Sequence, residues 1–431
     1  MLDIKFVREN ADLVQQKSQE KGYKVEVAQV LALDEKFRTL LLKAETLRRE
    51  RNELSDKAKN TKPAEADIAR GREIKTELAE LDPVLKETET AFLAAFKLIP
   101  NMPASDVPVG ASEDENQVVK EGGKKPEFSF PPKNHWQIGE ARGWIDKARA
   151  TKVAGTRFAY LKGDFVKLEW ALMRFAMDQL TNEEVLKKII AENNLKVSSK
   201  PFIPVLPPLM IRTELYDAMD RLEPREERYK IEGEELWLQG SAEHVLGSMH
   251  ADEIFEESEM PVRYVGFAAS FRREAGSYGK DMEGIIRLHQ FNKMEMESFS
   301  VPEKGLDEHL LMIAIQEHLL KQLGLPYHVV MKCTFDIGKP NARGVDMDVW
   351  LPGQDKYRET HTADYMTDYQ SRRLNTRVRR EDGSIQLIHT NDATALSERP
   401  LVAIIENNQR EDGTVVVPEV LRPYMNGLAV I

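Results

Sequence analysis

The most regular hydrophobic pattern in the chain is a heptad-like repeat in two blocks near the N-terminus. The first block comprises Leu33, Phe37, Leu40, Ala44, Leu47, Arg51, Leu54 and Ala58, and the second comprises Ile74, Leu78, Leu81, Leu85, Thr88, Phe92 and Ala95. Spacings that alternate between four and three residues are typical of helices that share a coiled-coil seam. Turn-forming residues, Asn60-Thr61-Lys62-Pro63, separate the blocks. The pattern predicts an antiparallel α-helical coiled-coil hairpin over about residues 31–97, with a break or kink at Asp82-Pro83.

The remainder of the chain mixes helical and strand patterns. Residues from about 98 to 135 are rich in Pro, Gly and charge, which predicts a linker between two domains. Strand patterns dominate from 255 to 350, and helical periodicity marks Phe165–Leu180, Leu306–Leu323 and Pro400–Asn407. Because helices and strands do not follow one another as regular βαβ units, the pattern predicts an α+β fold with an antiparallel sheet flanked by helices.

Residues 264–298 predict a β-hairpin with two chemically different faces. Val265, Phe267, Ala269 and Phe271 alternate on one face of its first strand. The other face carries Gly266, Ala268, Ser270, Arg272 and Glu274, and the second strand adds Arg287, His289, Phe291, Lys293, Glu295 and Glu297. A solvent-exposed face would also carry such charges. The small residues opposite them favour a ligand-binding face, because they leave room for a ligand to lie on the sheet.

Composition and charge narrow the class of protein. The chain has 431 residues, of which 41% are hydrophobic and 31% charged, and this composition is typical of a globular protein with two or three domains. The single cysteine, Cys333, excludes an internal disulfide and a zinc site with several cysteines. The absence of a long apolar run and the early charges in MLDIKFVREN predict a soluble, cytoplasmic protein with no membrane partner.

The charge of the predicted hairpin is asymmetric. The net charge of the chain is −11, yet residues 36–62 carry nine Lys or Arg residues against four acidic ones. Residues 64–97 carry five basic residues against eight acidic ones. A basic helix on a projecting arm suggests contact with a nucleic-acid backbone. A solvated coiled coil with interhelical ion pairs is the alternative interpretation, and the pattern alone leaves both open.

The common nucleotide-binding motifs are missing from the sequence. No G-x-G-x-x-G motif follows a predicted strand, and the segment Gly276–Asp281 lacks the spacing and the hydroxyl residue of a Walker loop. A nucleotide would therefore have to bind through another architecture.

Long runs of the sequence resemble the seryl-tRNA synthetases, a family of class II aminoacyl-tRNA synthetases. The matching runs are MLDIKFVREN, IPNMPASDVPVG, FIPVLPPLM (motif 1), FRREAGSYGKDMEGIIRLHQFNKMEM (motif 2), VWLPGQDKYRE and ERPLVAIIENNQREDGTVVVPEVLRPYM (motif 3 and its tail). The resemblance implies a homodimer with a tRNA-binding domain at residues 1–105 and a class II catalytic domain at 106–431. It also implies that L-serine and ATP form seryl-adenylate, and that serine then passes to the 3′ end of tRNA(Ser), and of tRNA(Sec) where the organism has one.

The resemblance also assigns a set of residues to ATP. These residues are Arg272, Arg273, Glu274, Arg287, Phe291, Glu359, Thr360, His361, Thr362 and Arg399. Arg272 matches the motif 2 arginine that binds the α-phosphate, and with Arg399 it matches the catalytic pair. Arg287 and Arg399 match the side chains that hold the γ-phosphate. Glu274 matches the acid that binds the adenine amino group, and Phe291 the ring on which adenine stacks.

The expected metal is magnesium. Glu359 and Thr362 match the family's pair that links Mg²⁺ to the phosphates, and a carboxylate and a hydroxyl are oxygen ligands of the kind that Mg²⁺ prefers. One branch of the family uses zinc, but through more than one cysteine. We therefore expect no zinc and assign no zinc-binding role to His361.

A further set of residues matches the family's serine pocket. These residues are Ser241, Ala242, Glu243, Arg272, Glu295, Asn391, Ala393 and Thr394. The segment before motif 3 is one residue shorter than the family pattern, and an ungapped count places the expected hydroxyl residue at Ala393, which has no hydroxyl. We therefore predict that Thr394, helped by Asn391, contacts the serine hydroxyl. The alternative is that Glu295 and Ser241 bind it alone.

The basic side chains expected to bind tRNA are Arg48, Arg49 and Arg51.

Two other classes of protein remain as alternatives. One is a family paralogue that forms an aminoacyl-adenylate and loads a non-tRNA carrier, but such paralogues lack the hairpin. The other is a non-catalytic RNA-binding relative, which should have lost the charges of motifs 2 and 3.

Overall fold

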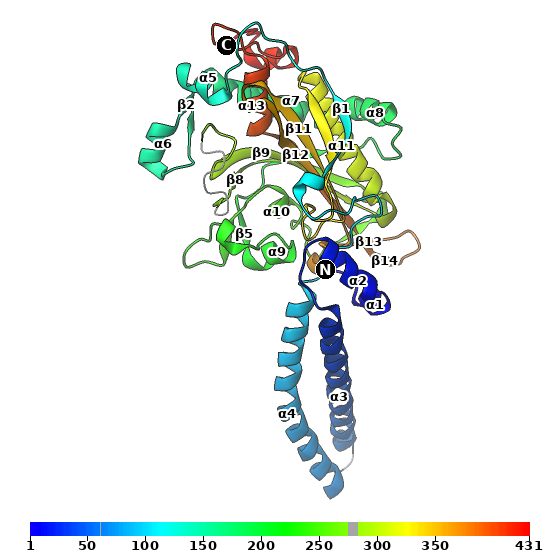
Figure 1. Cartoon of the computed structure of the whole chain (residues 1–431). Coiled ribbons are helices and arrows are strands. Elements are labelled where there is room, and N and C mark those ends of the chain that lie inside the picture. Colours follow the sequence, from blue (N-terminus) through cyan, green and yellow to red (C-terminus); the bar gives the residue numbers. More distant parts are fainter. Residues whose placement is uncertain (61, 275–282) are drawn as a thin grey trace. The chain divides into compact units, whose positions relative to one another are not determined.

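The computed structural model describes residues 1–60, 62–274 and 283–431 and divides into two compact units, Met1–Met102 and Pro103–Ile431 (Figure 1). The helices of the first unit are α1 (Ile4–Glu9), α2 (Ala11–Glu20), α3 (Val27–Asn60) and α4 (Glu65–Phe96). Figure 1 shows α3 and α4 as a long antiparallel pair, so the predicted helical hairpin is confirmed. Of the turn predicted between them, Thr61 lies outside the described residues.

The seam of the hairpin is built from the apolar positions that the repeat marks. Ala44 and Leu47 of α3 are buried against Ile74 and Leu78 of α4. The break expected at Asp82-Pro83 is absent, because α4 continues through Pro83. A proline removes one helical hydrogen bond, but packing of the neighbouring seam residues on both sides can hold the helix together.

The second unit is organised around a sheet of eight strands in the described part of the chain, in the order β1-β10-β11-β12-β15-β9-β8-β4. The strands are β1 (Gln117–Gly122), β4 (Ile203–Val205), β8 (Val262–Phe271), β9 (Gln290–Ser300), β10 (Tyr327–Met331), β11 (Arg343–Leu351), β12 (Lys356–Thr367) and β15 (His389–Ser397). All neighbours are antiparallel except β4 and β8, which confirms the predicted sheet. β1 lies in the stretch expected to be a linker. It is an edge strand whose side chains are mostly exposed, so it has no alternating hydrophobic pattern.

One face of this sheet is apolar and lies under helices. The helices that contribute to its core are α7 (Asp164–Leu180), α8 (Glu183–Glu192), α11 (Gly305–Gln322) and α13 (Glu398–Asn407). α7, α11 and α13 confirm the three helices predicted for this unit. Ala363, Ala393 and Met296 lie opposite one another on β12, β15 and β9 and are buried in this core.

The opposite face carries the polar residues of the same strands. Glu295 pairs with Gly266 on one side and with Thr394 on the other. A short helix, α10 (Glu243–Leu246), packs on this face at β8. Gly266 permits that approach, because a Cβ atom there would lie 2.8 Å from the Leu246 side chain.

The remaining elements are short and surround this sheet. They are α5 (His135–Ala141), α6 (Lys147–Ala154), α9 (Thr213–Ala218), α12 (Ser371–Leu374), β2 (Ile145–Asp146), β3 (Tyr160–Leu161), β5 (Met210–Arg212), β6 (Leu236–Leu238), β7 (Ile254–Glu256), β13 (Arg377–Arg379) and β14 (Ile385–Leu387). Within the ranges that the structure describes, no helix combines the length and the apolar character needed to cross a bilayer.

The fold generates one stability prediction, at the buried ion pair between β8 and α11. Arg263 Nε and Nη2 each donate to a Glu308 carboxylate oxygen at 2.7 Å, and both side chains are almost fully buried. Arg263→Met leaves the Glu308 carboxylate buried without its cation, so we expect a loss of about 3–5 kcal/mol in the free energy of unfolding. The double variant Arg263→Met/Glu308→Leu should recover part of this loss. Urea-induced unfolding measures both.

The matched control is the exposed ion pair of Arg379 with Glu256, at 3.3 Å. Arg379→Met should cost less than about 1 kcal/mol, because exposed ion pairs contribute little. Equal small losses at both sites would contradict a structural role for the Arg263–Glu308 pair.

Candidate active site

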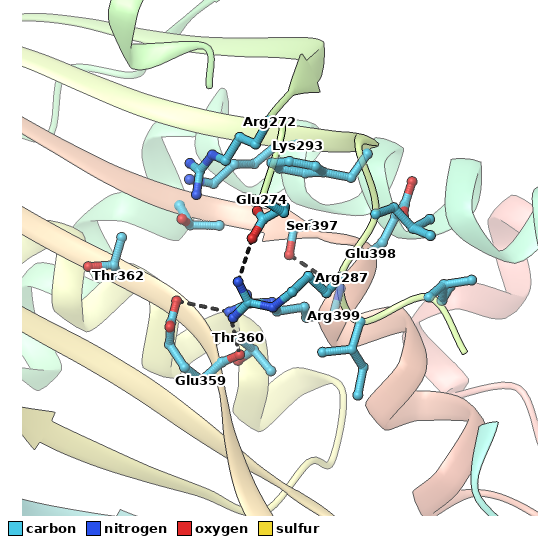
Figure 2. Close-up of a pocket in the computed structure, with 15 residues that line it drawn as sticks. Arg272, Glu274, Arg287, Lys293, Glu359, Thr360, Thr362, Ser397, Glu398 and Arg399 are labelled. Carbon is cyan, nitrogen blue, oxygen red and sulfur yellow. Dashed lines mark hydrogen bonds and ion pairs between the residues drawn. The ribbon is translucent and has the colours of Figure 1, made fainter. Parts of the chain in front are cut away.

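A pocket of about 110 Å³ lies on the polar face of the sheet, over β9, β15 and β12 and beside the end of β8 and the start of α13 (Figure 2). Three segments that are far apart in the sequence supply its charged side chains. These side chains are Arg272, Glu274, Arg287, Lys293, Glu359, Glu398 and Arg399. Figure 2 shows Arg272 and Lys293 on one side of the pocket and Arg287 and Arg399 on another. Several cations around one small pocket are the arrangement that a polyphosphate requires.

The position of Arg272 is fixed by its neighbours. It directly follows β8, and its Nε donates to the carbonyl oxygen of Gly240 at 2.9 Å. Its backbone N–H donates to the His289 carbonyl oxygen at 3.0 Å, which continues the pairing of the two strands. Its guanidinium carbon lies 5.4 Å from the centre of the Phe291 ring. The guanidinium is therefore held at one wall of the pocket, next to an aromatic surface.

Arg287 pairs with a glutamate that has an unusual backbone conformation. The Arg287 guanidinium is in hydrogen-bond contact with the Glu274 carboxylate. Glu274 has a φ of +51°, a left-handed conformation that costs energy for a residue with a side chain. Arg157 Nη1 donates to the Glu274 carbonyl oxygen at 2.9 Å. This contact holds the backbone of Glu274 in a conformation that directs its carboxylate into the pocket (Figure 2).

Arg399 lies at the start of α13, opposite Glu359 of β12. Ser397 is the N-cap of this helix and accepts a hydrogen bond from the Arg399 backbone at 3.3 Å. Arg399 Nη1 lies 3.0 Å from the Glu359 carboxylate and donates to its carbonyl oxygen at 2.9 Å. Desolvation opposes ionisation of Glu359, but Arg399 and Lys332 outweigh it and lower its pKa to about 2. Glu359 is thus an anion with a cation already beside it.

A second group of polar residues lies deeper on the same face. Lys293 Nζ lies 2.6 Å from a Glu295 carboxylate oxygen and donates to Ser241 Oγ at 3.2 Å. Thr394 Oγ1 makes a long contact of 3.5 Å with the same Glu295 oxygen. Burial raises the pKa of Glu295 to about 7, although Lys293 opposes the shift. Burial also disfavours the charge on Glu243, but nearby cations such as Lys293 hold its pKa below the usual range.

Oxygen atoms suited to a hard metal ion lie next to Glu359. Thr362 lies opposite Asp346 in the β11–β12 register and lines the pocket. Burial raises the pKa of Asp346 to about 7, while Lys332, at 3.4 Å, opposes the shift. In the parts of the chain that the structure describes, no three His, Cys, Asp or Glu side chains are arranged to hold a metal ion by themselves. A cation here would need further oxygens from a ligand.

The structure brings most of the expected ATP residues to the pocket but not all of them. Those that line it are Arg272, Glu274, Arg287, Phe291, Glu359, Thr360, Thr362 and Arg399. His361 is fully buried on the opposite face of β12, where it lies opposite Met347 of the core. The Arg273 guanidinium lies 5.9 Å from the centre of the Tyr229 ring, and Arg273 is not among the residues that line the pocket.

The expected serine residues also separate into two groups. Ser241, Glu243, Glu295 and Thr394 belong to the polar face described above. Ala393 belongs to the apolar core, and Asn391 Nδ2 donates to the Gly305 carbonyl oxygen at 3.1 Å on that same side of the sheet. Ala242 packs against Leu246 and Ala268. Strand alternation explains this separation into two groups. Residues 392 and 394 lie on the polar face of the sheet, and residues 391 and 393 lie on the opposite face.

Sequence reasoning missed three residues of this region. The strand alternation placed Lys293 on the ligand-binding face, but we assigned no function to it from the sequence. In the structure it pairs with Glu295. Asp392 shares its face with Thr394, and strand register could have found it. Arg221 lies 3.2 Å from Asp392. No local pattern marks Arg221, because its contact arises only in the tertiary structure.

The basic residues of the hairpin differ in their surroundings. Arg48 forms an interhelical ion pair with Asp82 at 2.8 Å, as the coiled-coil interpretation predicts. Arg49 and Arg51 are exposed on α3. Their guanidinium groups are accessible to a partner in solvent.

Comparison with known proteins places this geometry in a family. Residues 227–408 match the family described as "tRNA synthetase class II core domain (G, H, P, S and T)", and residues 1–103 match "Seryl-tRNA synthetase N-terminal domain". Serine–tRNA ligases from Syntrophotalea carbinolica and Thermodesulfovibrio yellowstonii are 39% and 40% identical to the chain. These alignments cover 99% of both chains for the first protein and 100% of both for the second.

Solved structures agree with these relatives. The crystal structure of seryl-tRNA synthetase from Pyrococcus horikoshii complexed with ATP is 36% identical to the chain, with a TM-score of 0.88 over 100% of this chain and 99% of that chain. The cytoplasmic serine–tRNA ligase from Naegleria fowleri in complex with AMP is 28% identical, with a TM-score of 0.84 over 100% and 98%. Both structural similarities extend over the helical hairpin and the antiparallel sheet with its cationic pocket. Together with the full-length sequence matches, they show that the chain belongs to the seryl-tRNA synthetase family of class II aminoacyl-tRNA synthetases.

Proposed function

We propose that the protein is a serine–tRNA ligase, which activates L-serine with ATP and transfers it to the 3′ end of tRNA(Ser). The observation that carries this proposal is the convergence of Arg272, Arg287 and Arg399 on one pocket beside the buried carboxylates of Glu243 and Glu295. Full-length similarity to serine–tRNA ligases supports it. The helical hairpin argues against a paralogue that loads a carrier other than tRNA. A tRNA(Sec) is a second acceptor where the organism has one.

Adenylate formation requires positioning and charge stabilisation rather than a covalent nucleophile. Arg272 holds the α-phosphate and stabilises the charge that develops as the serine carboxylate attacks it. Arg287 and Arg399 bind the γ-phosphate through N–H groups that remain beside their contacts with Glu274 and Glu359. Phe291 provides the stacking surface for adenine.

Magnesium fits the oxygen atoms at the edge of this pocket. Glu359 and Thr362 would bind Mg²⁺ with the remaining ligands supplied by phosphate oxygens and water, as is usual for this ion. When bound, Mg²⁺ would neutralise phosphate charge. We propose no zinc site, since Cys333 is the single cysteine and its thiol donates to the Ser112 carbonyl oxygen.

The amino acid binds on the deeper part of the polar face. Glu243 and Glu295 supply acceptors for the ammonium group, and acceptors are what a cationic donor requires. Thr394 carries a hydroxyl on this face, so it is better placed for the serine side chain than Ala393 or Asn391. Ser241, which accepts from Lys293, completes the polar surroundings.

The assembly that we propose is a cytoplasmic homodimer. Four apolar residues in and after the edge strand β4 expose between 41% and 82% of their surface: Ile203 of β4, Leu206 and Leu209 of the following loop, and Met210 at the start of β5. Contiguous exposed apolar residues mark protein interfaces. This segment is the one that resembles motif 1, through which class II synthetases dimerise.

The first functional prediction concerns the reaction itself. ATP–pyrophosphate exchange should depend on L-serine in a panel of amino acids, and the protein should charge tRNA(Ser). Arg272→Ala should reduce exchange by at least a thousandfold, because the α-phosphate loses its charge partner. The variant should melt at the parent's temperature, since the side chain faces the pocket. Near-normal exchange by this variant would remove Arg272 from the catalytic site.

The second prediction concerns the hairpin. Arg49→Glu/Arg51→Glu should weaken tRNA(Ser) binding and lower the slope of log K against log salt by roughly one unit for each lost phosphate contact. Serine-dependent pyrophosphate exchange should stay unchanged. Arg48→Glu, which also breaks the pair with Asp82, provides a comparison within the same helix. Charging equal to the parent's would favour a purely structural hairpin.

The third prediction concerns the serine hydroxyl. Thr394→Ala should increase the use of alanine relative to serine in pyrophosphate exchange, because the pocket loses a group that pairs with the hydroxyl. Ala393→Ser should change this ratio little, since residue 393 faces the core. An unchanged ratio in Thr394→Ala would assign hydroxyl recognition to Glu295 and Ser241.

A further inference from the structure

A row of three carboxylates lies directly beyond the proposed serine pocket. Asp392 of β15 lies opposite Glu297 of β9 on one side and opposite Asp364 of β12 on the other. Residues that are directly opposed in antiparallel strands share a face. This row is therefore on the same face as Glu295 and Thr394 and two residues further along the strands, about 7 Å away.

These three carboxylates are buried and would repel one another if they were charged. Glu297 is fully buried, and within the described residues neither of its carboxylate oxygens has a hydrogen-bond partner. Burial, followed by Asp392, raises the pKa of Glu297 well above its usual value. Burial likewise raises the pKa of Asp392 well above its usual value, and the charge of Arg221 opposes the rise at both residues.

Arg221, an arginine from outside the sheet, contacts two members of this row. Arg221 Nη2 lies 3.2 Å from Asp392 Oδ2 and 3.7 Å from Asp364 Oδ2. The same nitrogen donates to Asn341 Oδ1 at 3.2 Å. Arg221 is also one of the cations that lower the pKa of Glu243. Its side chain thus links two central strands and acts electrostatically on the proposed ammonium acceptor.

The backbone around Arg221 is held by contacts that do not involve its guanidinium group. Gln370 Nε2 donates to the Met219 carbonyl oxygen at 3.1 Å, and Lys339 Nζ lies 3.0 Å from Asp220. Arg228 Nε donates to the Arg221 carbonyl oxygen at 3.1 Å. The segment should therefore keep its path when the Arg221 side chain is shortened.

We propose that Arg221 determines amino-acid specificity by holding Asp392 and Asp364 together as the end wall of the pocket. Arg221 is a positioning residue, because it acts on the substrate through these carboxylates and through Glu243. The wall begins one strand row beyond Thr394, and it limits the space available to a side chain larger than that of serine. This inference rests on serine being the substrate and names a residue that excludes threonine.

Loss of the guanidinium has two consequences. Asp392 and Asp364 lose the guanidinium that joins them, so the two buried carboxyl groups are no longer held together and water can enter and displace the wall. Glu243 loses one of its neighbouring cations. Neither change touches Arg272, Arg287 or Arg399. The damage should therefore appear in the use of the amino acid and not in the use of ATP.

The test is pyrophosphate exchange with separate titrations of serine, threonine and ATP. Arg221→Met should raise KM for serine at least tenfold and lower the serine-to-threonine ratio of kcat/KM at least tenfold, with KM for ATP changed less than twofold. Arg221→Met/Asp392→Asn should show a lower serine KM than Arg221→Met, because the stranded carboxylate is gone. Arg225→Met is the matched control, since Arg225 lies on the same segment, is largely exposed and pairs with Glu223. This control should behave as the parent does.

If Arg221→Met does not fold, the variant Arg221→Lys tests the proposal. A lysine keeps the positive charge but has a different reach and lacks the planar guanidinium, so we expect an intermediate serine KM and an intermediate loss of discrimination. An unchanged serine-to-threonine ratio would overturn the proposal. Parallel rises in the KM of serine and of ATP, with a lower melting temperature, would also overturn it. Absence of serine-dependent exchange in the parent protein would instead contradict the proposed function.

Discussion

The register of the central strands β8, β9, β15 and β12 is the constraint on which the rest of the second unit depends. Side chains alternate between the two faces of a sheet, so a slip of one residue would exchange them all. In this register Met296, Ala393 and Ala363 enter the core, while Glu295 and Thr394 face the pocket. Burial of the apolar row under α11 fixes the register. The same burial therefore fixes which charged groups meet on the other face.

Charge balance on the polar face is the second organising feature. A buried carboxylate is stable only when it is neutral or has a cation beside it. The structure uses both solutions: Lys293 pairs with Glu295, Arg221 joins Asp392 and Asp364, and Glu297 takes a raised pKa. The outer pocket follows the same rule, because Arg399 is paired with Glu359. These acids direct the cations toward the place where substrates would bind.

The helical hairpin is governed by simpler physics. Its two helices bury a narrow apolar seam against each other, and ion pairs such as Arg70–Glu50 and Arg48–Asp82 flank that seam. Its basic side chains divide accordingly. Those at the helix–helix boundary form interhelical ion pairs, and others, such as Arg49 and Arg51, are exposed on α3. The ion pairs agree with the coiled-coil interpretation for the residues that form them, and contact of Arg49 and Arg51 with tRNA stays a prediction.

Several features of this protein were determined by its sequence alone, because they depend on residues close together in the chain. The heptad repeat predicted the hairpin, and strand alternation placed small residues opposite the charges of β9. The motif runs identified the family and most of the pocket residues. The structure differs at two places: α4 continues through Pro83 without a break, and the stretch expected to be a linker contains β1, which pairs with β10.

Two features were decided only by the tertiary structure. One is the face of the sheet on which each residue of the shortened segment before motif 3 lies. The other is the distant residue, Arg221, that contacts the buried carboxyl group of Asp392. Asn391, Ala393 and His361 turn toward the side of the sheet that the helices cover, whereas Asp392 turns toward the polar face and meets Arg221 from 171 residues away. No sequence pattern predicts the contact between Asp392 and Arg221. It arises because the core fixes the register, and the register places these carboxyl groups on the polar face, where the folded chain brings Arg221 to them.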